Sequence, residues 1–166
     1  VNLYAFEKTV TGEHRFEEAV ESIDIGGPAM VRAAAKNHAN VFVVVDPEDY
    51  ASVLEAVAAG AGDDLKRELA AKAFAHTAYY DSLIARYLST EAELPRLSPT
   101  ITIGMRNDGA VLRYGENPHQ RAALYSAGET GGIANAEQLH GKEMSFNNYV
   151  DAEAAWNLVQ DFSELA

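Results

Sequence analysis

The sequence predicts an α/β fold in which a doubly wound, parallel-sheet domain is followed by a linker and the start of a second α/β domain. Residues 41–45 are an unbroken run of Val and Phe, which is typical of a strand buried on both faces of a parallel sheet. Apolar residues with a helical period precede and follow this run. The periodicity is lost over 89–100, which holds two prolines, and alternation begins beyond it. We therefore expect a first domain at 1–90, a linker at 91–100 and a second domain at 101–166.

The first elements are expected in the order strand, loop, helix, helix. Residues 1–6 alternate as a strand does, and the polar residues 7–15 are expected to form a loop. A short helix follows at 16–22. Pro28 suits the first turn of the next helix, because its missing N–H would have no partner there. This alanine-rich helix is expected to end near Asn37.

Two more helices are expected after the buried run. The first extends from Pro47 to Val57, and the second is capped by Asp63 or Asp64 and ends at about Leu88. The apolar seam of the second helix consists of Leu65, Leu69, Ala73, His76, Tyr80, Leu83 or Ile84, and Tyr87. A histidine in such a seam is more often a packed core residue than a ligand, so we interpret the seam as core.

The second domain is expected to begin with a hairpin. Residues 100–105 alternate as a strand, Asn107-Asp108-Gly109 is turn chemistry, and residues 110–114 form the returning strand. Residues 122–125 are a further candidate strand, followed by a glycine-rich loop at 126–143. A last helix capped by Asp151 is expected after it. Its apolar face would consist of Ala152, Ala155, Trp156, Val159 and Phe162.

Composition and charge exclude several functional classes. The 166 residues suit one domain or slightly more, and the net charge of −12 argues against non-specific binding of nucleic acid. Without cysteine the chain has no disulfide and no thiolate-bound zinc, and its five histidines lack metal-binding spacing. No apolar run is long enough to span a membrane and no signal peptide is visible, so we expect a cytoplasmic protein.

Two constellations of chemically active side chains remain, of which the first surrounds the alanine-rich helix. It consists of Tyr4, Asp24, Arg32 and Lys36. Arg32 and Lys36 are four residues apart and share a helix face. A carboxylate near a buried lysine can form a general acid–base pair, in which each group shifts the pKa of the other. The structural alternative is that Asp24 and Lys36 only complement the helix dipole at its two ends.

The second constellation follows the expected hairpin. It consists of Arg113, Tyr114, Asn117 and His119. An arginine beside a tyrosine suits a ligand with a phosphate group and a flat ring. The structural alternative is an ordered loop with internal hydrogen bonds.

Five motifs occur together and in order. They are Asn-Leu-Tyr at 2–4, Ile-Asp-Ile-Gly-Gly-Pro at 23–28, Val-Arg-Ala-Ala-Ala-Lys-Asn-His at 31–38, Lys-Ala-Phe-Ala-His-Thr-Ala at 72–78, and Leu-Arg-Tyr-Gly-Glu-Asn-Pro-His-Gln at 112–120. With these motifs the chain, over essentially its whole length, closely resembles the PurH family of bifunctional purine-biosynthesis enzymes. These enzymes combine AICAR transformylase with IMP cyclohydrolase.

The resemblance implies two reactions and two folds. A formyl group passes from 10-formyltetrahydrofolate, a co-substrate, to AICAR, and formyl-AICAR then closes with loss of water to IMP. No metal is implied for this chemistry. The implied folds are the C-terminal part of a methylglyoxal-synthase-like domain and the start of a cytidine-deaminase-like α/β domain. The implied partners are these small molecules and a second copy of the full-length chain, not nucleic acid or a membrane.

The resemblance also implies site residues. The cyclohydrolase residues are Tyr4, Asp24 and Lys36. We expect Arg32 to bind substrate because its spacing places it on the helix face of Lys36, and not because of the resemblance. The AICAR-binding residues are Arg113, Tyr114, His119 and Asn148. Ring closure needs a base, oxyanion stabilisation and an acid for the departing water. We expect Asp24 to deprotonate or orient the amine, Lys36 to stabilise negative charge and Tyr4 to relay a proton.

The chain departs from the family pattern in two ways. Ala5 stands where the family usually has Pro, so the turn that places Tyr4 is less rigid. Further active-site residues of the family fall before the position of Val1 and beyond that of Ala166. We therefore expect an internal part of a longer protein that is inactive alone. The alternative is a methylglyoxal-synthase-like module that binds an anionic metabolite without turnover, which leaves residues 101–166 unexplained.

Overall fold

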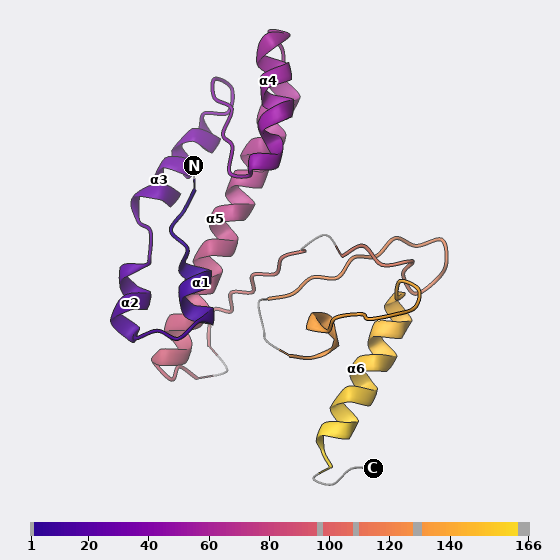
Figure 1. The fold of residues 1–166 in the computed structure, drawn as a ribbon. Coiled ribbons are helices and arrows are strands. Elements are labelled where there is room, and N and C mark those ends of the chain that lie inside the picture. Colours follow the sequence, from indigo (N-terminus) through magenta and orange to yellow (C-terminus); the bar gives the residue numbers. More distant parts are fainter. Residues whose placement is uncertain (1, 96–97, 108–109, 128–130, 163–166) are drawn as a thin grey trace. The chain divides into compact units, whose positions relative to one another are not determined.

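The computed structural model describes residues 2–95, 98–107, 110–127 and 131–162 (Figure 1). The chain divides into two compact units, Val1–Gly104 and Met105–Ala166, each with its own internal contacts. The domain boundaries expected from the sequence stay a prediction.

The first unit is built on one long helix. Its helices are α1 (Phe6–Thr11), α2 (Phe16–Glu21), α3 (Gly26–Lys36), η1 (Pro47–Asp49), α4 (Tyr50–Ala58) and α5 (Asp63–Glu91). Both α3 and α1 pack against α5, as Figure 1 shows. The apolar periods at 16–22, 28–37, 47–57 and 63–88 are thus confirmed as helices, with small shifts at their ends.

Two buried clusters join these helices. The first lies between α3 and α5 and contains Val31, Ala35, Val43, Leu69, Ala70 and Ala73. The second lies between α1, α2 and α5 and contains Phe6, Ala19, Tyr80 and Leu83. In the second cluster, the Phe6 ring meets the Tyr80 ring edge-on at 6.2 Å between centroids. Burial of these side chains is the main source of the unit's stability.

The N-terminal segment differs from the expected strand and loop. Helix α1 starts at Phe6, so the loop expected at 7–15 is wrong over residues 7–11. Phe6 is fully buried, and its packing outweighs the polar character of the residues that follow. The described residues 2–5 form no strand. There, the Tyr4 N–H that a neighbouring strand would use donates instead to the Asp24 carboxylate.

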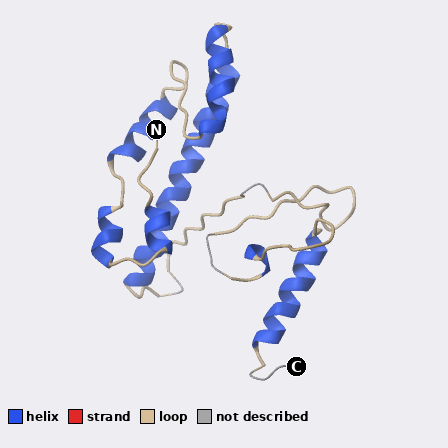
Figure 2. Cartoon of the chain, in the orientation of Figure 1, coloured by secondary structure: helices blue, strands red, loops and turns tan. Residues whose placement is uncertain are grey.

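Residues 41–45 form neither a helix nor a strand. In the described part of the chain no residue is assigned to a strand, as Figure 2 shows, so the doubly wound sheet is not seen there. Val43 is buried, and its neighbours Phe42, Val44 and Val45 pack against the cluster between α3 and α5. The run therefore buries one residue fully and the others in part, against helices, and not on both faces of a sheet as predicted.

The second unit contains a short antiparallel pairing and one long helix. Isolated bridges join Arg106 to Ser126 and Val111 to Ala123. The expected hairpin partner is therefore wrong in the described residues: backbone bonds join 110–112 to 122–124, whereas Arg113 and Tyr114 bond to Met144 and Phe146. The expected turn at Asn107-Asp108-Gly109 lies partly outside the described residues. The short helix η2 (Ile133–Asn135) and helix α6 (Phe146–Gln160) follow.

Helix α6 begins five residues before its expected cap. Ser145 is the N-cap, and it forms a capping box with Asn148 instead of leaving this role to Asp151. The expected apolar face is not buried, since Trp156 is 45% and Val159 is 55% exposed. Within the residues described, no helix is both long enough and apolar enough to cross a bilayer.

Candidate functional site

The start of helix α3 is organised around the Asp24 carboxylate. Its Oδ1 accepts the Gly27 N–H at 2.7 Å, and its Oδ2 accepts the Tyr4 N–H at 3.1 Å. The first bond satisfies one of the free N–H groups at the helix start. The second ties the N-terminal segment to the helix. Asp24 is therefore half-buried and oriented by two backbone donors, one on each oxygen.

The backbone of Asp24 is fixed from the opposite side. Its N–H donates to the Tyr80 hydroxyl at 2.7 Å, and that hydroxyl lies 3.3 Å from the Ser22 carbonyl oxygen, to which it donates. Burial raises the pKa of the Tyr80 hydroxyl, so it stays protonated and able to donate. Sequence analysis placed Tyr80 in the core seam only, because the 56 residues that separate it from Asp24 hide the contact.

Tyr4 meets Asp24 through its main chain. The residue is 62% exposed, so Tyr4 is accessible to solvent. The structure thus brings Tyr4 and Asp24 together, although they are 20 residues apart in sequence. An exposed tyrosine whose main chain is bonded to an oriented carboxylate is suited to contact a bound ligand.

Arg32 and Lys36 lie on the exposed surface of α3. The Arg32 guanidinium stands over the Phe74 ring of α5, 5.6 Å from its centroid. Lys36 is the last residue of α3, whereas Asp24 precedes its first turn. Because a helix of 11 residues is roughly 16 Å long, Asp24 and Lys36 do not form a direct acid–base pair. They can act only on different parts of a ligand.

In the second unit, Arg113 and Tyr114 fold onto each other. The guanidinium carbon of Arg113 lies 4.8 Å from the Tyr114 ring centroid, and a guanidinium N–H of Arg113 donates to the Tyr114 hydroxyl at 3.2 Å. Their backbones are tied to the start of α6: Arg113 N–H donates to the Met144 carbonyl and Phe146 N–H donates to the Tyr114 carbonyl, each at 3.1 Å. This exposed cation and half-buried ring are held next to α6.

The loop after Tyr114 is closed by internal hydrogen bonds. Gly115 N–H donates to the Gln120 carbonyl at 2.8 Å, and the Asn117 N–H donates to the Gln120 side chain at 2.8 Å. A side chain at Gly115 would lie 2.9 Å from Gln120 Cβ, so this close approach needs glycine. Asn117 thus has the structural role that sequence analysis left open, while His119 is exposed at the tip.

Asn148 helps to cap the start of helix α6. Its Oδ1 accepts the Ser145 N–H at 3.1 Å and the Ser145 hydroxyl at 2.9 Å. The spacing of Ser and Asn three residues apart is the sequence signal of this capping box, and it was missed. Asn148 therefore lies on the first turn of α6, near the residues to which Arg113 and Tyr114 are bonded.

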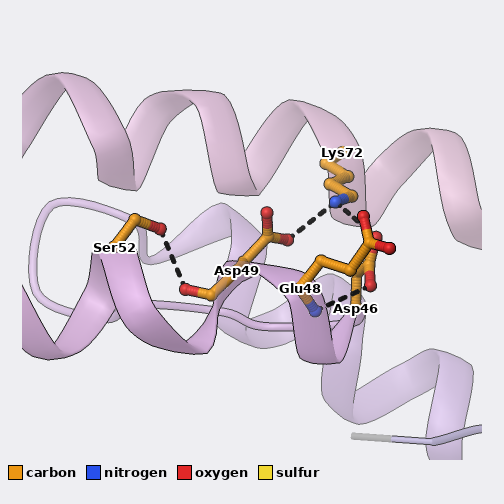
Figure 3. A network of polar contacts seen from close by, with 5 residues as sticks. All are labelled: Asp46, Glu48, Asp49, Ser52 and Lys72. Carbon is orange, nitrogen blue, oxygen red and sulfur yellow. Dashed lines mark hydrogen bonds and ion pairs between the residues drawn. The ribbon is translucent and has the colours of Figure 1, made fainter.

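A third polar cluster, which sequence analysis did not predict, lies between α5 and the start of α4. Lys72 Nζ contacts Asp46 Oδ2 at 2.6 Å and Asp49 Oδ2 at 2.8 Å, as Figure 3 shows. Asp46 also accepts the Glu48 N–H at 3.0 Å, which caps η1. The hydrogen bond to Asp46 raises the pKa of Lys72, and the same bond lowers the pKa of Asp46. This cluster fastens the segment after 41–45 to α5.

Replacing Lys72 by Met should lower the free energy of unfolding most at neutral pH. The Asp46 contribution is lost as pH falls through its lowered pKa, and the Lys72 contribution is lost as pH rises through its raised pKa. The stabilisation is therefore complete between about pH 4, the pKa of an aspartate in the unfolded chain, and about pH 10, the pKa of a lysine in the unfolded chain. Urea unfolding of the full-length protein across this range, at low and high salt, measures it.

The matched control for Lys72→Met is Arg67→Met. Arg67 forms a local, exposed pair with Asp64 three residues away. Such a pair contributes little. A difference between Lys72→Met and wild type that stays constant from pH 2 to 7 would show that the ion pairs do not stabilise the fold.

Comparison with known proteins gives a consistent family match. The family model described as AICARFT/IMPCHase bienzyme matches residues 34–166. The chain is 51% identical over 173 residues to the bifunctional purine biosynthesis protein PurH of Halalkalibacterium halodurans. It is 51% identical over 174 residues to that of Bacillus subtilis and 50% over 172 residues to that of Persephonella marina. Each match covers 100% of this chain and 33% of the relative, so the chain spans about a third of these relatives' length.

Proposed function

We propose, because the chain belongs to the AICARFT/IMPCHase bienzyme family, that its full-length protein catalyses two successive steps of purine biosynthesis. In the first, a formyl group passes from 10-formyltetrahydrofolate to the amine of AICAR. In the second, formyl-AICAR closes to IMP with loss of water. The observation that carries the proposal is the family match, which extends over residues 34–166 and so includes parts of both compact units.

We assign ring closure to the start of α3. The carboxamide nitrogen of formyl-AICAR attacks the formyl carbon and loses one proton, and the formyl oxygen becomes a hydroxyl. This hydroxyl is protonated and leaves as water, while the formylated nitrogen loses its own N–H proton and the ring C=N bond forms. Each carboxylate oxygen of Asp24 accepts one backbone N–H and has a second lone pair, so the group can still accept the proton of the attacking nitrogen. Tyr4 is exposed and its N–H bonds this carboxylate, and we assign its phenol the relay of a proton.

The two cations of α3 serve a different end of the substrate. Lys36 and Arg32 are exposed, and Lys36 is a helix length away from Asp24. We therefore assign to both of them contacts with negative charge on the substrate away from the reacting atoms. The expected role of Lys36 thus becomes the binding of this charge rather than of the charge that develops where Asp24 acts. The cation–π contact with Phe74 holds the Arg32 guanidinium over α5.

We assign AICAR binding for formyl transfer to Arg113 and Tyr114. A guanidinium binds phosphate through two parallel hydrogen bonds, and the Tyr114 ring offers a flat face to the imidazole-carboxamide. His119 and Asn148 are the further contacts in this proposal. The backbone bonds from Arg113 and Tyr114 to the start of α6 support it, because they hold this pair near Asn148.

Replacing Arg113 by Lys should weaken AICAR binding by about 1–3 kcal/mol, the scale of a charged hydrogen bond. Lysine keeps the charge but loses both the planar fork and the contact with the Tyr114 ring. Calorimetric titration of the full-length protein with AICAR measures the change. Arg67→Lys, an exposed arginine on α5, is the control, and an unchanged dissociation constant in Arg113→Lys would remove Arg113 from the site.

For the fold and assembly we propose the family layout. Residues 1–90 would belong to a methylglyoxal-synthase-like domain, 91–100 to a linker and 101–166 to a cytidine-deaminase-like domain, in a cytoplasmic homodimer. The apolar, β-branched composition of 41–45 and its packing against the core support a place for this run in a sheet of the full-length protein.

Product analysis tests the proposed function. The full-length protein is supplied with AICAR and 10-formyltetrahydrofolate, and the nucleotides are separated by chromatography over time. We expect formyl-AICAR to appear transiently and IMP to accumulate. Unchanged AICAR, with the added nucleotide still bound by the protein, would instead support a metabolite-binding module.

A further inference from the structure

Tyr80 is a buried tyrosine whose hydroxyl forms hydrogen bonds to backbone groups outside its own helix. It lies in the middle of α5 and is 6% exposed. Its ring packs in the cluster with Phe6, Ala19 and Leu83. A buried hydroxyl needs hydrogen-bond partners, and here they come from the loop between α2 and α3. The side chain therefore links the core of the unit to that loop.

The hydroxyl holds the backbone on both sides of Ile23. It accepts the Asp24 N–H at 2.7 Å and donates to the Ser22 carbonyl, 3.3 Å away. On the other side of Asp24, the carboxylate is held by the Gly27 and Tyr4 N–H groups. Asp24 thus has its main chain anchored to α5 and its side chain anchored to α3 and the N-terminal segment.

We infer that Tyr80 is a positioning residue for ring closure, acting by holding the Asp24 main chain so that the carboxylate faces the substrate. The inference rests on the proposed function, because it assumes that Asp24 contacts the reacting atoms. Tyr80 itself is buried and does not touch the substrate. Loss of its hydroxyl would free the Asp24 N–H from its partner and let the loop at 22–25 shift, while the ring would keep its packing.

Tyr87 provides a matched control on the same helix. Its ring also packs edge-on against Phe6, at 5.8 Å between centroids. Its hydroxyl lies 3.2 Å from His14 Nε2, so it bonds a residue outside the Asp24 loop. Tyr80→Phe and Tyr87→Phe each remove one hydroxyl from the same region of the core. Only Tyr80→Phe removes a bond to the loop that carries Asp24.

The test uses steady-state kinetics of the full-length protein with formyl-AICAR. In Tyr80→Phe we expect kcat for ring closure to fall about tenfold, the scale of one hydrogen bond, with KM changed less than about twofold. Formyl transfer should stay unchanged, and Tyr87→Phe should match wild type in both reactions. Adding Tyr80→Phe to Asp24→Asn should cause no further loss, because the two act through one group.

Three outcomes would overturn the inference: wild-type kcat in Tyr80→Phe, an equal loss in Tyr87→Phe, or full additivity with Asp24→Asn.

Amide hydrogen exchange adds a readout that does not depend on activity. The Asp24 amide should exchange faster in Tyr80→Phe and at the wild-type rate in Tyr87→Phe. If exchange behaves in this way but Asp24→Asn closes the ring at the wild-type rate, the proposed role of Asp24 fails and the positioning role fails with it. If Asp24→Asn is inactive and Tyr80→Phe is not impaired, only the inference about Tyr80 fails.

Discussion

Replacing Asp24 by Asn is expected to slow ring closure by about 10²-fold or more, the scale of a lost general acid–base group. Asparagine has nearly the same shape and keeps one oxygen to accept a backbone N–H, so the start of α3 stays capped. It loses the charge and the basic oxygen that would take the proton from the attacking nitrogen. The measurement is the rate of IMP formation from formyl-AICAR by the full-length protein, together with its thermal unfolding.

Asp46→Asn is the control for this substitution. Asp46 also accepts a backbone N–H at the start of a helix, but its other oxygen bonds Lys72 instead of facing the candidate site. We expect Asp46→Asn to affect stability and to leave ring closure unchanged. Wild-type ring closure in Asp24→Asn would mean that Asp24 only caps α3, as the structural alternative holds.

Replacing Gly27 by Ala is expected to lower the free energy of unfolding by about 1–3 kcal/mol, as overpacking of a filled site does. A Cβ at this position would overlap the Asp24 carboxylate and would lie 2.8 Å from Leu3 Cδ2. The carboxylate can move away only by giving up the N–H groups of Gly27 and Tyr4. Ring closure should therefore fall along with stability. Urea unfolding and the formyl-AICAR assay measure the two effects.

Gly26→Ala is the matched control, because a Cβ added at Gly26 has nothing within 4 Å. It should leave both the stability and the Asp24 contacts close to wild type, since alanine is the better helix former. Equal behaviour of the two alanine variants would show that the close packing of Gly27 against Asp24 is unimportant.

The helices of the first unit could be predicted because each has a clear apolar period. Helix α3 begins and ends where its Gly-Gly-Pro start and its Asn37 end indicate. Helix α1 could not be predicted in this way, because it is short and polar and depends on one buried residue, Phe6. The partner of residues 110–112 differs from the prediction, since turn residues favour a local hairpin over the more distant segment at 122–124.

The candidate site shows the same division between local and distant information. Arg113 and Tyr114 are neighbours in sequence, and their contact follows from that adjacency. The contact of Asp24 with Tyr4 spans 20 residues and its contact with Tyr80 spans 56, so only the packing of α1 and α3 on α5 brings them together. Lys72 and its aspartates are likewise separated by more than 20 residues. The residue types of the candidate site can be identified from the sequence, whereas the contacts between them follow only from the fold.

The central claim is that the chain contributes to two reactions through two separate groups of residues, one around Asp24 and one around Arg113. Its most direct test is to measure both rates on the same preparations of wild type, Asp24→Asn and Arg113→Lys, supplying formyl-AICAR directly for ring closure. Crossed losses are predicted: Asp24→Asn loses ring closure and keeps formyl transfer, while Arg113→Lys at limiting AICAR loses formyl transfer and keeps ring closure. If both variants lost the same reaction, or each lost both reactions equally, the claim of two separate sites would be contradicted.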